Sequence, residues 1–276
     1  MMDIQRKNIK YNFLKTIIVR FDFQGVFDSE MEKLLPLIKP YLKEKNFTRY
    51  TRRKNNTLEV NFDSAVLQTP ILNNVQNQII HSFINDDSGY VLDISNSFVC
   101  LNIRSTSYSP FEEYSDLISY IIKFYKEHID FFSVTRIGIR KINECVLKDK
   151  DKINEFFSQD YFRYFSLNKD VHNFFSDKKD TFGFGDNYKG NLSCKIEQGK
   201  INSTEHYKLT LDIDIYIDNT QLINKTNDYE IKLQEMNNII FDIFVNALTE
   251  KLKQALITND NDFEFNDELL GVERNE

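Results

Sequence analysis

Alternating apolar and polar residues mark several short stretches of the chain as β-strands. The cleanest alternation runs over 206–218, where leucines and isoleucines occupy five successive odd positions and polar residues lie between them. Because successive side chains of a strand face opposite sides of a sheet, this pattern predicts a strand with one buried face. Similar β-rich runs predict further strands at 13–23, 78–84, 90–94, 98–104, 133–146 and 191–198.

A second pattern, with apolar residues three and four positions apart, predicts amphipathic helices. The most regular example covers 109–129. Ser109 and Glu112 have the spacing of a capping box, and Pro110 falls at the first helical position, where its missing N–H costs nothing. The apolar stripe behind this start needs a flat apolar surface to cover it, and the adjoining strands are expected to supply it.

Two other stretches show the helical pattern. The first covers 28–45 and is expected to be capped by its first or second residue. Pro36 and Pro40 inside it predict a kink or a restart, because an interior proline removes a helical hydrogen bond. The second is predicted as one long helix over 228–257, capped by Asp228 or by the asparagine before it.

Together these elements predict an α+β fold, a mainly antiparallel sheet with the two longest helices packed on one face. We divide the chain into an N-terminal half, 1–150, a C-terminal half, 151–257, and an acidic tail, 258–276. Each half contains strands, a hairpin and a long amphipathic helix, which suggests a diverged duplication, although no residue-level repeat is visible.

Two arginines share one face of the strand predicted at 133–146. Arg136 and Arg140 point to one side, while the isoleucines and the lysine at the intervening odd positions point to the other, toward the expected helix. Neighbouring guanidinium groups need anions. Asp212 and Asp214 can supply them as internal salt bridges across the sheet. The alternative is a small anionic ligand bound by the arginines.

The same strand carries a resemblance to a known family. Residues 135–143 read Thr-Arg-Ile-Gly-Ile-Arg-Lys-Ile-Asn, which resembles the T-R-[IL]-G-[IL]-R-x-I-N strand of a sporadically distributed, uncharacterised family of bacterial and archaeal proteins. Leu101-Asn102 and the stretches 16–22 and 241–256 fit the same family, so the resemblance spans most of the chain. It implies a shared fold and carries over no catalytic residues.

Residues 47–62 are predicted to form a β-hairpin that turns at Lys54-Asn55-Asn56, because asparagine tolerates positive φ. Basic residues gather at or near this tip beside one aromatic side chain: Arg49, Tyr50, Arg52, Arg53 and Lys54. Such a patch fits nucleic acid or an acidic protein surface. The simpler interpretation is a solubilised hairpin end.

Three of the eight glycines fall within 182–190, between aromatic residues. Phosphate-binding loops place their glycines between a strand and a helix, but a strand follows here, so we reject a phosphate site. The segment is instead interpreted as a mobile arm that contacts a partner through Phe182, Phe184 and Tyr188. The acidic tail, with Phe263 and Phe265, is predicted to be partly ordered and to bind a partner as well.

Composition narrows the function classes. A net charge of −7 counts against a protein that binds nucleic acid mainly through phosphate contacts. Three widely separated cysteines are typical of free thiols in a reducing compartment. No signal-peptide core opens the sequence, and no apolar run is long enough to span a bilayer. We therefore expect a soluble, cytoplasmic protein without membrane contacts.

The familiar motifs of catalysis do not occur in the sequence, neither those for nucleotides and zinc nor the nucleophile elbow. Cys100 or Cys145 could meet a histidine in the fold, but any chain with several of each allows that. Asp212 and Asp214 lie on the same face of one strand, roughly 6.5–7 Å apart, too far to chelate a cation without further ligands. We predict no catalytic residue, cofactor or metal site.

The leading hypothesis is a non-catalytic protein-interaction subunit, with the identity of its partner and its oligomeric state left open. The sporadic distribution of the family it resembles suggests a bacterial defence or toxin–antitoxin type assembly. One alternative is a nucleic-acid-binding or -cleaving protein that uses the basic hairpin. Another is a sensor of a small anionic ligand that uses Arg136 and Arg140.

Overall fold

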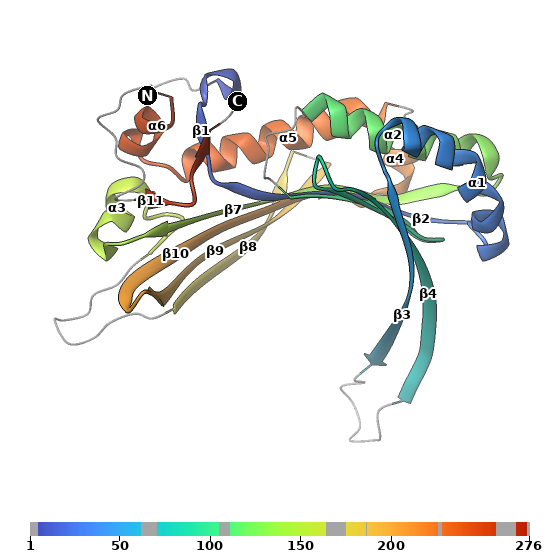
Figure 1. Cartoon of the computed structure of the whole chain (residues 1–276), viewed down its shortest axis with the longest axis horizontal. Coiled ribbons are helices and arrows are strands. Elements are labelled where there is room, and N and C mark those ends of the chain that lie inside the picture. The colour runs from blue at the N-terminus through green and yellow to red at the C-terminus, as the bar shows by residue number, and fades with distance from the viewer. Residues whose placement is uncertain are drawn as a thin grey trace.

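The three longest helices lie on one side of a large antiparallel sheet (Figure 1). The computed structural model describes residues 5–61, 71–104, 111–163, 175–185, 187–225, 228–257 and 269–274. The predicted fold class, α+β with a mainly antiparallel sheet and long amphipathic helices on one face, is confirmed.

Within the described residues the sheet has ten strands, and all neighbouring strands are antiparallel. In spatial order they are β3 (Arg49–Asn61), β4 (Ile71–Asn85), β5 (Tyr90–Ile94), β6 (Phe98–Arg104), β2 (Leu14–Gln24), β7 (Ser133–Leu147), β10 (Thr204–Ile217), β9 (Tyr188–Ile201) and β8 (Phe175–Phe184), with β11 (Leu269–Leu270) beside β7. Because β7 pairs with β10, residues on both sides of position 150 build one continuous sheet.

The helices are η1 (Arg6–Asn8), α1 (Asp28–Glu44), α2 (Phe111–His128), η2 (Lys150–Lys152), α3 (Ile153–Phe156), α4 (Thr220–Lys225), α5 (Tyr229–Asn246) and α6 (Glu250–Ile257). Beneath them, Ile137 and Ile139 of β7 are completely buried, so the predicted helix-facing side of this strand is confirmed. Phe13 packs its ring against Phe157 and against Phe244 of α5, which joins both ends of the chain in one core.

Helix α1 continues through both of its prolines, so the predicted restart near Pro36 is wrong. Pro36 and Pro40 lie four residues apart on the exposed side of the helix, where water can bond to the carbonyls that lose their partners. The helix is capped by neither of its first two residues. Instead, the backbone N–H of Phe27 donates to the Glu30 carboxylate at 2.8 Å.

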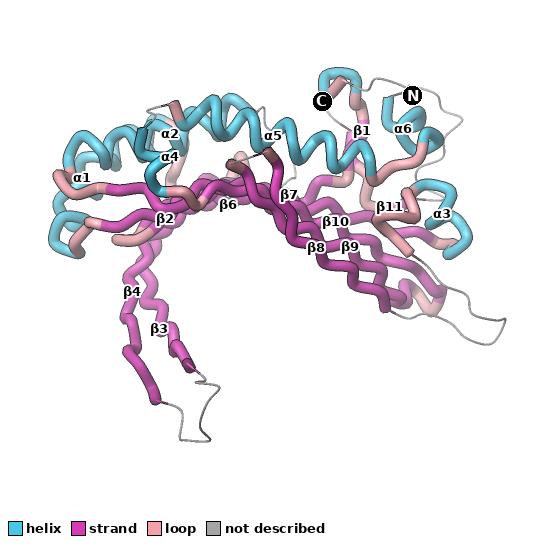
Figure 2. The backbone as a smooth tube through the Cα atoms, turned by 180° about the vertical axis from the view of Figure 1, so that it is seen from behind, coloured by secondary structure: helices cyan, strands magenta, loops and turns pink. Residues whose placement is uncertain are grey.

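The basic hairpin does not turn where the sequence predicted. β3 runs straight through Lys54-Asn55-Asn56, and these residues pair with β4 in regular register. The local turn preference of asparagine is overridden by the continuous ladder with β4. The pairing continues to Asn61 and Ile71, and residues 62–70 lie outside the described part of the structure. β3 and β4 extend together away from the helices (Figure 2).

The glycine-rich segment is part of the sheet. β8 and β9 pair along their length up to Phe184 and Tyr188, so the interpretation as a free arm is wrong. Gly190 allows this pairing to be close, because a Cβ at that position would lie 2.4 Å from the ring of Phe182. Gly190 therefore permits close packing within the sheet edge, whereas Gly185 lies in the turn after β8.

The helix predicted to run unbroken over 228–257 is two helices. Asp228 caps α5 as predicted, accepting a hydrogen bond from the Ile231 N–H at 3.2 Å. The break before α6 occurs because residues 156–158 bond to the backbone there: Ser158 N–H donates to the Ala247 carbonyl, and Thr249 N–H donates to that of Phe156.

Part of the acidic tail returns to the core. Leu269 of β11 is 1% exposed and pairs with Leu147 of β7. A second short strand, β12 (Glu273–Arg274), pairs with β1 (Tyr11–Asn12) near the start of the chain. Phe263 and Phe265 lie outside the described residues. No described helix combines the length and the apolar character needed to cross a membrane.

Candidate functional site

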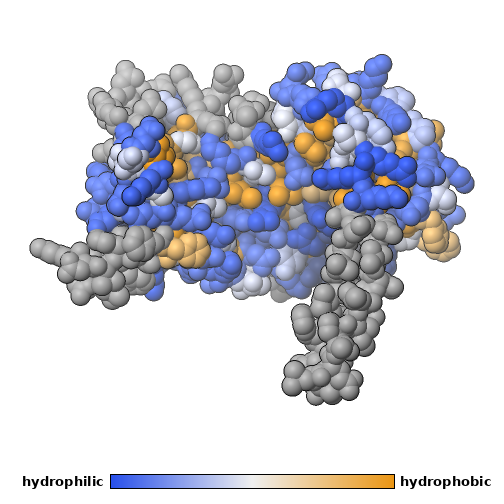
Figure 3. All heavy atoms as spheres, turned by 60° about the horizontal axis from the view of Figure 1, so that its bottom comes forward, coloured by the Kyte–Doolittle hydropathy of each residue, from blue (hydrophilic) through white to orange (hydrophobic). Residues whose placement is uncertain are grey.

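The side of the sheet opposite the helices, which we call the open face, is concave (Figures 1 and 2). Polar residues occupy most of the molecular surface on this side, and apolar residues gather between them (Figure 3). A small apolar cluster separate from the main core is formed by Ile80, Phe98 and Cys100, with Ile18 packed against it. Ile80, Phe98 and Cys100 are themselves buried, so on the open face a small buried apolar cluster lies beneath charged side chains.

The two arginines of the family-like strand lie on this face and bond to carboxylates of β10. Arg140 donates from Nε and Nη2 to both oxygens of Asp212, at 2.7 and 2.5 Å. Arg136 donates from Nη2 to Asp214 at 3.0 Å and lies over the ring of Tyr216, 4.6 Å from its centre. These are the partners that the internal salt-bridge interpretation named. The bond to Asp212 also raises the pKa of Arg140.

We predict that the Arg140–Asp212 pair is worth about 0.5–1 kcal/mol, because its geometry is bidentate but the arginine remains accessible to water. A double-mutant cycle of Arg140→Ala and Asp212→Ala, followed by urea unfolding, measures this coupling. It should shrink as salt is added. A coupling of zero at low salt would contradict the prediction.

Similar pairs continue across the open face, and in each the cation is more exposed than its carboxylate. The exposed fractions are 60% for Arg53 against 9% for its partner Asp93, and 46% for Arg140 against 18% for Asp212. Arg20 follows the same rule with its partner on β2 and lies over the ring of Phe98. Carboxylates form the base of this surface, and guanidinium groups form its outer layer.

The basic cluster of β3 is divided between the two faces of the sheet. Arg49 and Arg53 lie on the open face, where they pair with Asp86 and Asp93. The alternate positions face the helical side: Tyr50 bonds to Nδ1 of His81 at 2.8 Å, Arg52 approaches Glu32 of α1 at 3.8 Å, and exposed Lys54 follows two residues on. Burial, together with Arg52, lowers the pKa of His81. The sequence cluster therefore does not form a single patch.

The aromatic residues proposed for partner binding face the helical side as well. Phe182 packs over Gly190, and the Tyr188 hydroxyl donates to the Glu235 carboxylate of α5. Phe184 remains 45% exposed at the end of β8. Tyr188 thus attaches the β8–β9 edge to α5, Phe182 packs within that edge, and the partner-binding role predicted for Phe184 remains a prediction.

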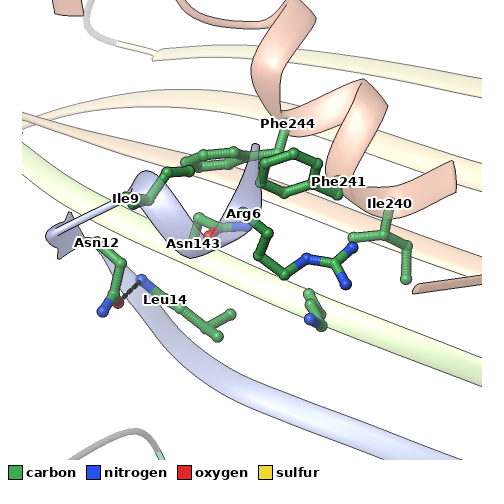
Figure 4. Close-up of a pocket in the computed structure, with 9 residues that line it drawn as sticks. Arg6, Ile9, Asn12, Leu14, Asn143, Ile240, Phe241 and Phe244 are labelled. Carbon is green, nitrogen blue, oxygen red and sulfur yellow. Dashed lines mark hydrogen bonds between the residues drawn. The ribbon is translucent and has the colours of Figure 1, made fainter. Parts of the chain in front are cut away.

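Sequence analysis did not identify a pocket that lies between the N-terminal segment, β7 and α5 (Figure 4). Its volume is about 80 Å³, and Arg6 and Lys141 line it together with apolar side chains such as Phe241 and Phe244. Lys141 Nζ donates to Asn237 Oδ1 at 2.7 Å, and Arg6 Nη2 donates to the backbone carbonyl of the same residue at 2.9 Å. Two cations thus meet at one residue of α5.

The electrostatics of this pocket are unusual. Burial of the Lys141 ammonium, with the Arg6 guanidinium nearby, lowers the pKa of the lysine to about 7. Lys141 as a residue is only partly buried, and none of the described residues that line the pocket is acidic. One feature of the sequence could have indicated this pocket. Lys141 occupies an odd position of its strand, on the same side as the buried Ile137 and Ile139.

The cysteines show no sign of nucleophilic chemistry. All three are free and buried, and burial raises the pKa of Cys100 to about 11 and that of Cys194 to about 12. Burial also raises the pKa of Cys145. Their thiols are therefore protonated at neutral pH. The described part of the chain holds no group of three or more His, Cys, Asp or Glu side chains arranged to bind a metal ion.

Comparison with models of known protein families and with curated proteins finds no match to the chain.

Proposed function

We propose that the protein is a non-catalytic interaction subunit that binds an acidic surface of a partner protein on the open face of its sheet. One observation carries the proposal: the guanidinium groups of this face lie outside the carboxylates that they pair with. An incoming acidic surface therefore meets the N–H groups of arginine before it meets the aspartates. Arginine is enriched in protein interfaces for its planar, multidentate hydrogen bonding.

The apolar cluster supports the same proposal. Phe98 and Ile80 lie in the open face, and the Arg20 guanidinium covers the ring of Phe98 at 4.3 Å from its centre. The cluster is buried in this structure, so it supports the arginine layer from beneath, and the Phe98 ring holds the Arg20 guanidinium at the surface. Because the face is concave, a partner could contact the strands at both ends of the sheet, β3 and β4 at one end and β8 to β10 at the other (Figure 1).

A protein partner fits better than nucleic acid, which was the main alternative. Nucleic-acid binding draws its affinity from many phosphate contacts, whereas Arg20, Arg53 and Arg140 each already pair with a carboxylate and could supply only a few contacts of that kind. A protein interface needs only a few charged contacts, because it combines them with neutral hydrogen bonds and apolar contacts. The net charge of −7 opposes association with any anionic partner, and most strongly with the densely charged backbone of a nucleic acid. A partner from a defence or toxin–antitoxin type assembly remains the part of the proposal that rests on the family resemblance of residues 135–143.

The test compares charge removal on the two sides of the molecule. We expect the double variant Arg53→Gln/Arg140→Gln to lose the partner protein in a quantitative pull-down from cells that naturally contain this chain. Lys123→Gln is the matched control, because Lys123 is also 46% exposed and also paired, to Glu230, but lies among the helices. This control variant should retain the partner.

Circular dichroism of each variant establishes that it is folded. Equal retention by the two variants, or equal loss, would overturn the proposal. Binding of the parent protein to a fluorescent DNA or RNA oligonucleotide, with a steep salt dependence that the double variant loses, would instead establish the nucleic-acid alternative.

A further inference from the structure

The pocket between the N-terminal segment, β7 and α5 is lined by two basic side chains and by no acidic one among the described residues. Lys141 and Arg6 supply its charged donors, and their hydrogen bonds end on the oxygens of Asn237 and Asn238, both neutral. The side chain of Asn237 is itself buried, and its Nδ2 has no partner among the described residues. A buried cation without an anion is costly. The described lining of the pocket therefore lacks a counter-ion, and a negatively charged acceptor would be favoured.

The walls of the pocket restrict what such an anion can be. Phe241 and Phe244 of α5 face Ile9 and Leu14 across it, and the Arg6 side chain extends along the ring of Phe241, 4.8 Å from its centre (Figure 4). Inorganic phosphate could accept from both cations, but it would lose much of its hydration against these walls and has no apolar part to contact them. A carboxylate attached to a short apolar body would satisfy both parts of the pocket.

We propose that this pocket binds a small monocarboxylate with a short aliphatic or aromatic body, its carboxylate held by Arg6 and Lys141. The carboxylate accepts hydrogen bonds from both cations, and the apolar body contacts the phenylalanine rings. The pocket lies on the helical side of the sheet, away from the open face, so this inference does not depend on the proposed partner surface.

Proton uptake distinguishes a ligand-binding lysine from a merely buried one. Arg6 and Lys141 are the charged side chains among the described residues that line the pocket. Since the ligand-free lysine has a pKa of about 7, most of it is neutral at pH 8. A bound carboxylate favours the ammonium form, so binding at pH 8 should take up close to one proton.

The experiment uses the full chain at pH 7, with sodium salts of acetate, butyrate and benzoate at matched ionic strength, and with chloride and inorganic phosphate for comparison. We expect butyrate or benzoate to raise Tm and to saturate in calorimetric titration, while phosphate and chloride do not. Calorimetry at pH 8 in two buffers of different ionisation enthalpy measures the proton uptake.

Two variants make the result specific. Lys141→Met should weaken carboxylate binding at least about tenfold, since a charge-assisted hydrogen bond is lost, and should abolish proton uptake. Lys208→Met, which removes a lysine of the open face, should bind as the parent does. Arg6→Gln should weaken binding without abolishing proton uptake, which provides a second test if Lys141→Met fails to fold.

The ligand-free proteins give an independent readout. An unfolded lysine has a pKa of about 10.4, so between pH 7 and pH 10 the unfolded chain binds more protons at Lys141 than the native chain does. The free energy of unfolding of the parent should therefore include a contribution that rises with pH over this range. Lys141→Met should lack that contribution. The absence of saturable carboxylate binding, equal binding of phosphate, or unchanged binding and proton uptake in Lys141→Met would overturn the proposal.

Discussion

Phe21→Ala is expected to lower the free energy of unfolding by about 3–5 kcal/mol, a large part of the stability of a typical domain. Phe21 is fully buried in β2, the strand that lies between β6 and β7 in the sheet. Its ring meets that of Tyr229 edge to face, with the centres 5.6 Å apart. Truncation to alanine leaves a cavity between the sheet and α5, and the packing around it can relax only in part. Urea unfolding measures the loss.

Phe131→Ala is the matched control, because it removes the same atoms from a side chain that is 79% exposed. Its effect should stay within about 0.5 kcal/mol. If the two variants were equally stable, the assignment of β2 to the centre of the core would be contradicted.

Gly25→Ala is expected to destabilise the protein by about 2–5 kcal/mol. Gly25 follows β2 with a φ of +87°, a conformation that residues with a Cβ rarely adopt. An added Cβ would lie 1.9 Å from the carbonyl oxygen of Phe131, so the two backbone segments would have to separate. Thermal and urea unfolding of the variant measure the cost.

Two other glycines separate the two parts of this effect. Gly185 has a φ of +57° with open space around its would-be Cβ, so Gly185→Ala should cost only the conformational part, about 1–2 kcal/mol. Gly199 lies within β9 with open space and no positive φ, so Gly199→Ala should be neutral or slightly stabilising. A Gly25→Ala variant no less stable than Gly185→Ala would contradict the predicted clash.

Local pattern predicted much of the architecture. The strands at 90–94 and 98–104 match β5 and β6, and the alternation at 206–218 matches β10. The helix predicted over 109–129 matches α2, and its apolar stripe is the buried side of α2. These elements were predictable because their periodicity reports directly which side chains are buried.

The errors have a common cause. Asn55 and Asn56 favour a turn on their own, yet pairing with β4 keeps them in a strand. Residues 247–249 would continue a helix, yet residues 156–158 take their backbone hydrogen bonds. The glycines of 183–190 look mobile in sequence, yet pairing between β8 and β9 orders them. In each case the deciding hydrogen bonds come from another segment of the chain, and the pattern of the predicted stretch contains no information about that segment.

The candidate sites divide in the same way. Arg140 and Asp212 could be paired from sequence, because strand alternation placed each on the polar face of its strand. The sequence could not predict that the guanidinium groups are more exposed than their carboxylates, because exposure depends on how the side chains pack on the curved sheet. The pocket could not be predicted either. Arg6 and Lys141 are far apart in the sequence and come together because both donate hydrogen bonds to Asn237 of α5.

The amino-acid sequence by itself determined the α+β class, most strands and helices, and the side of the sheet that each strand residue faces. Its periodicities encode burial, and burial drives those local choices. The tertiary structure alone decided the strand order, the uncovered concave face and the enclosure of Lys141 beside Arg6. These features arise from contacts between segments far apart in the chain, whose energies no local pattern records.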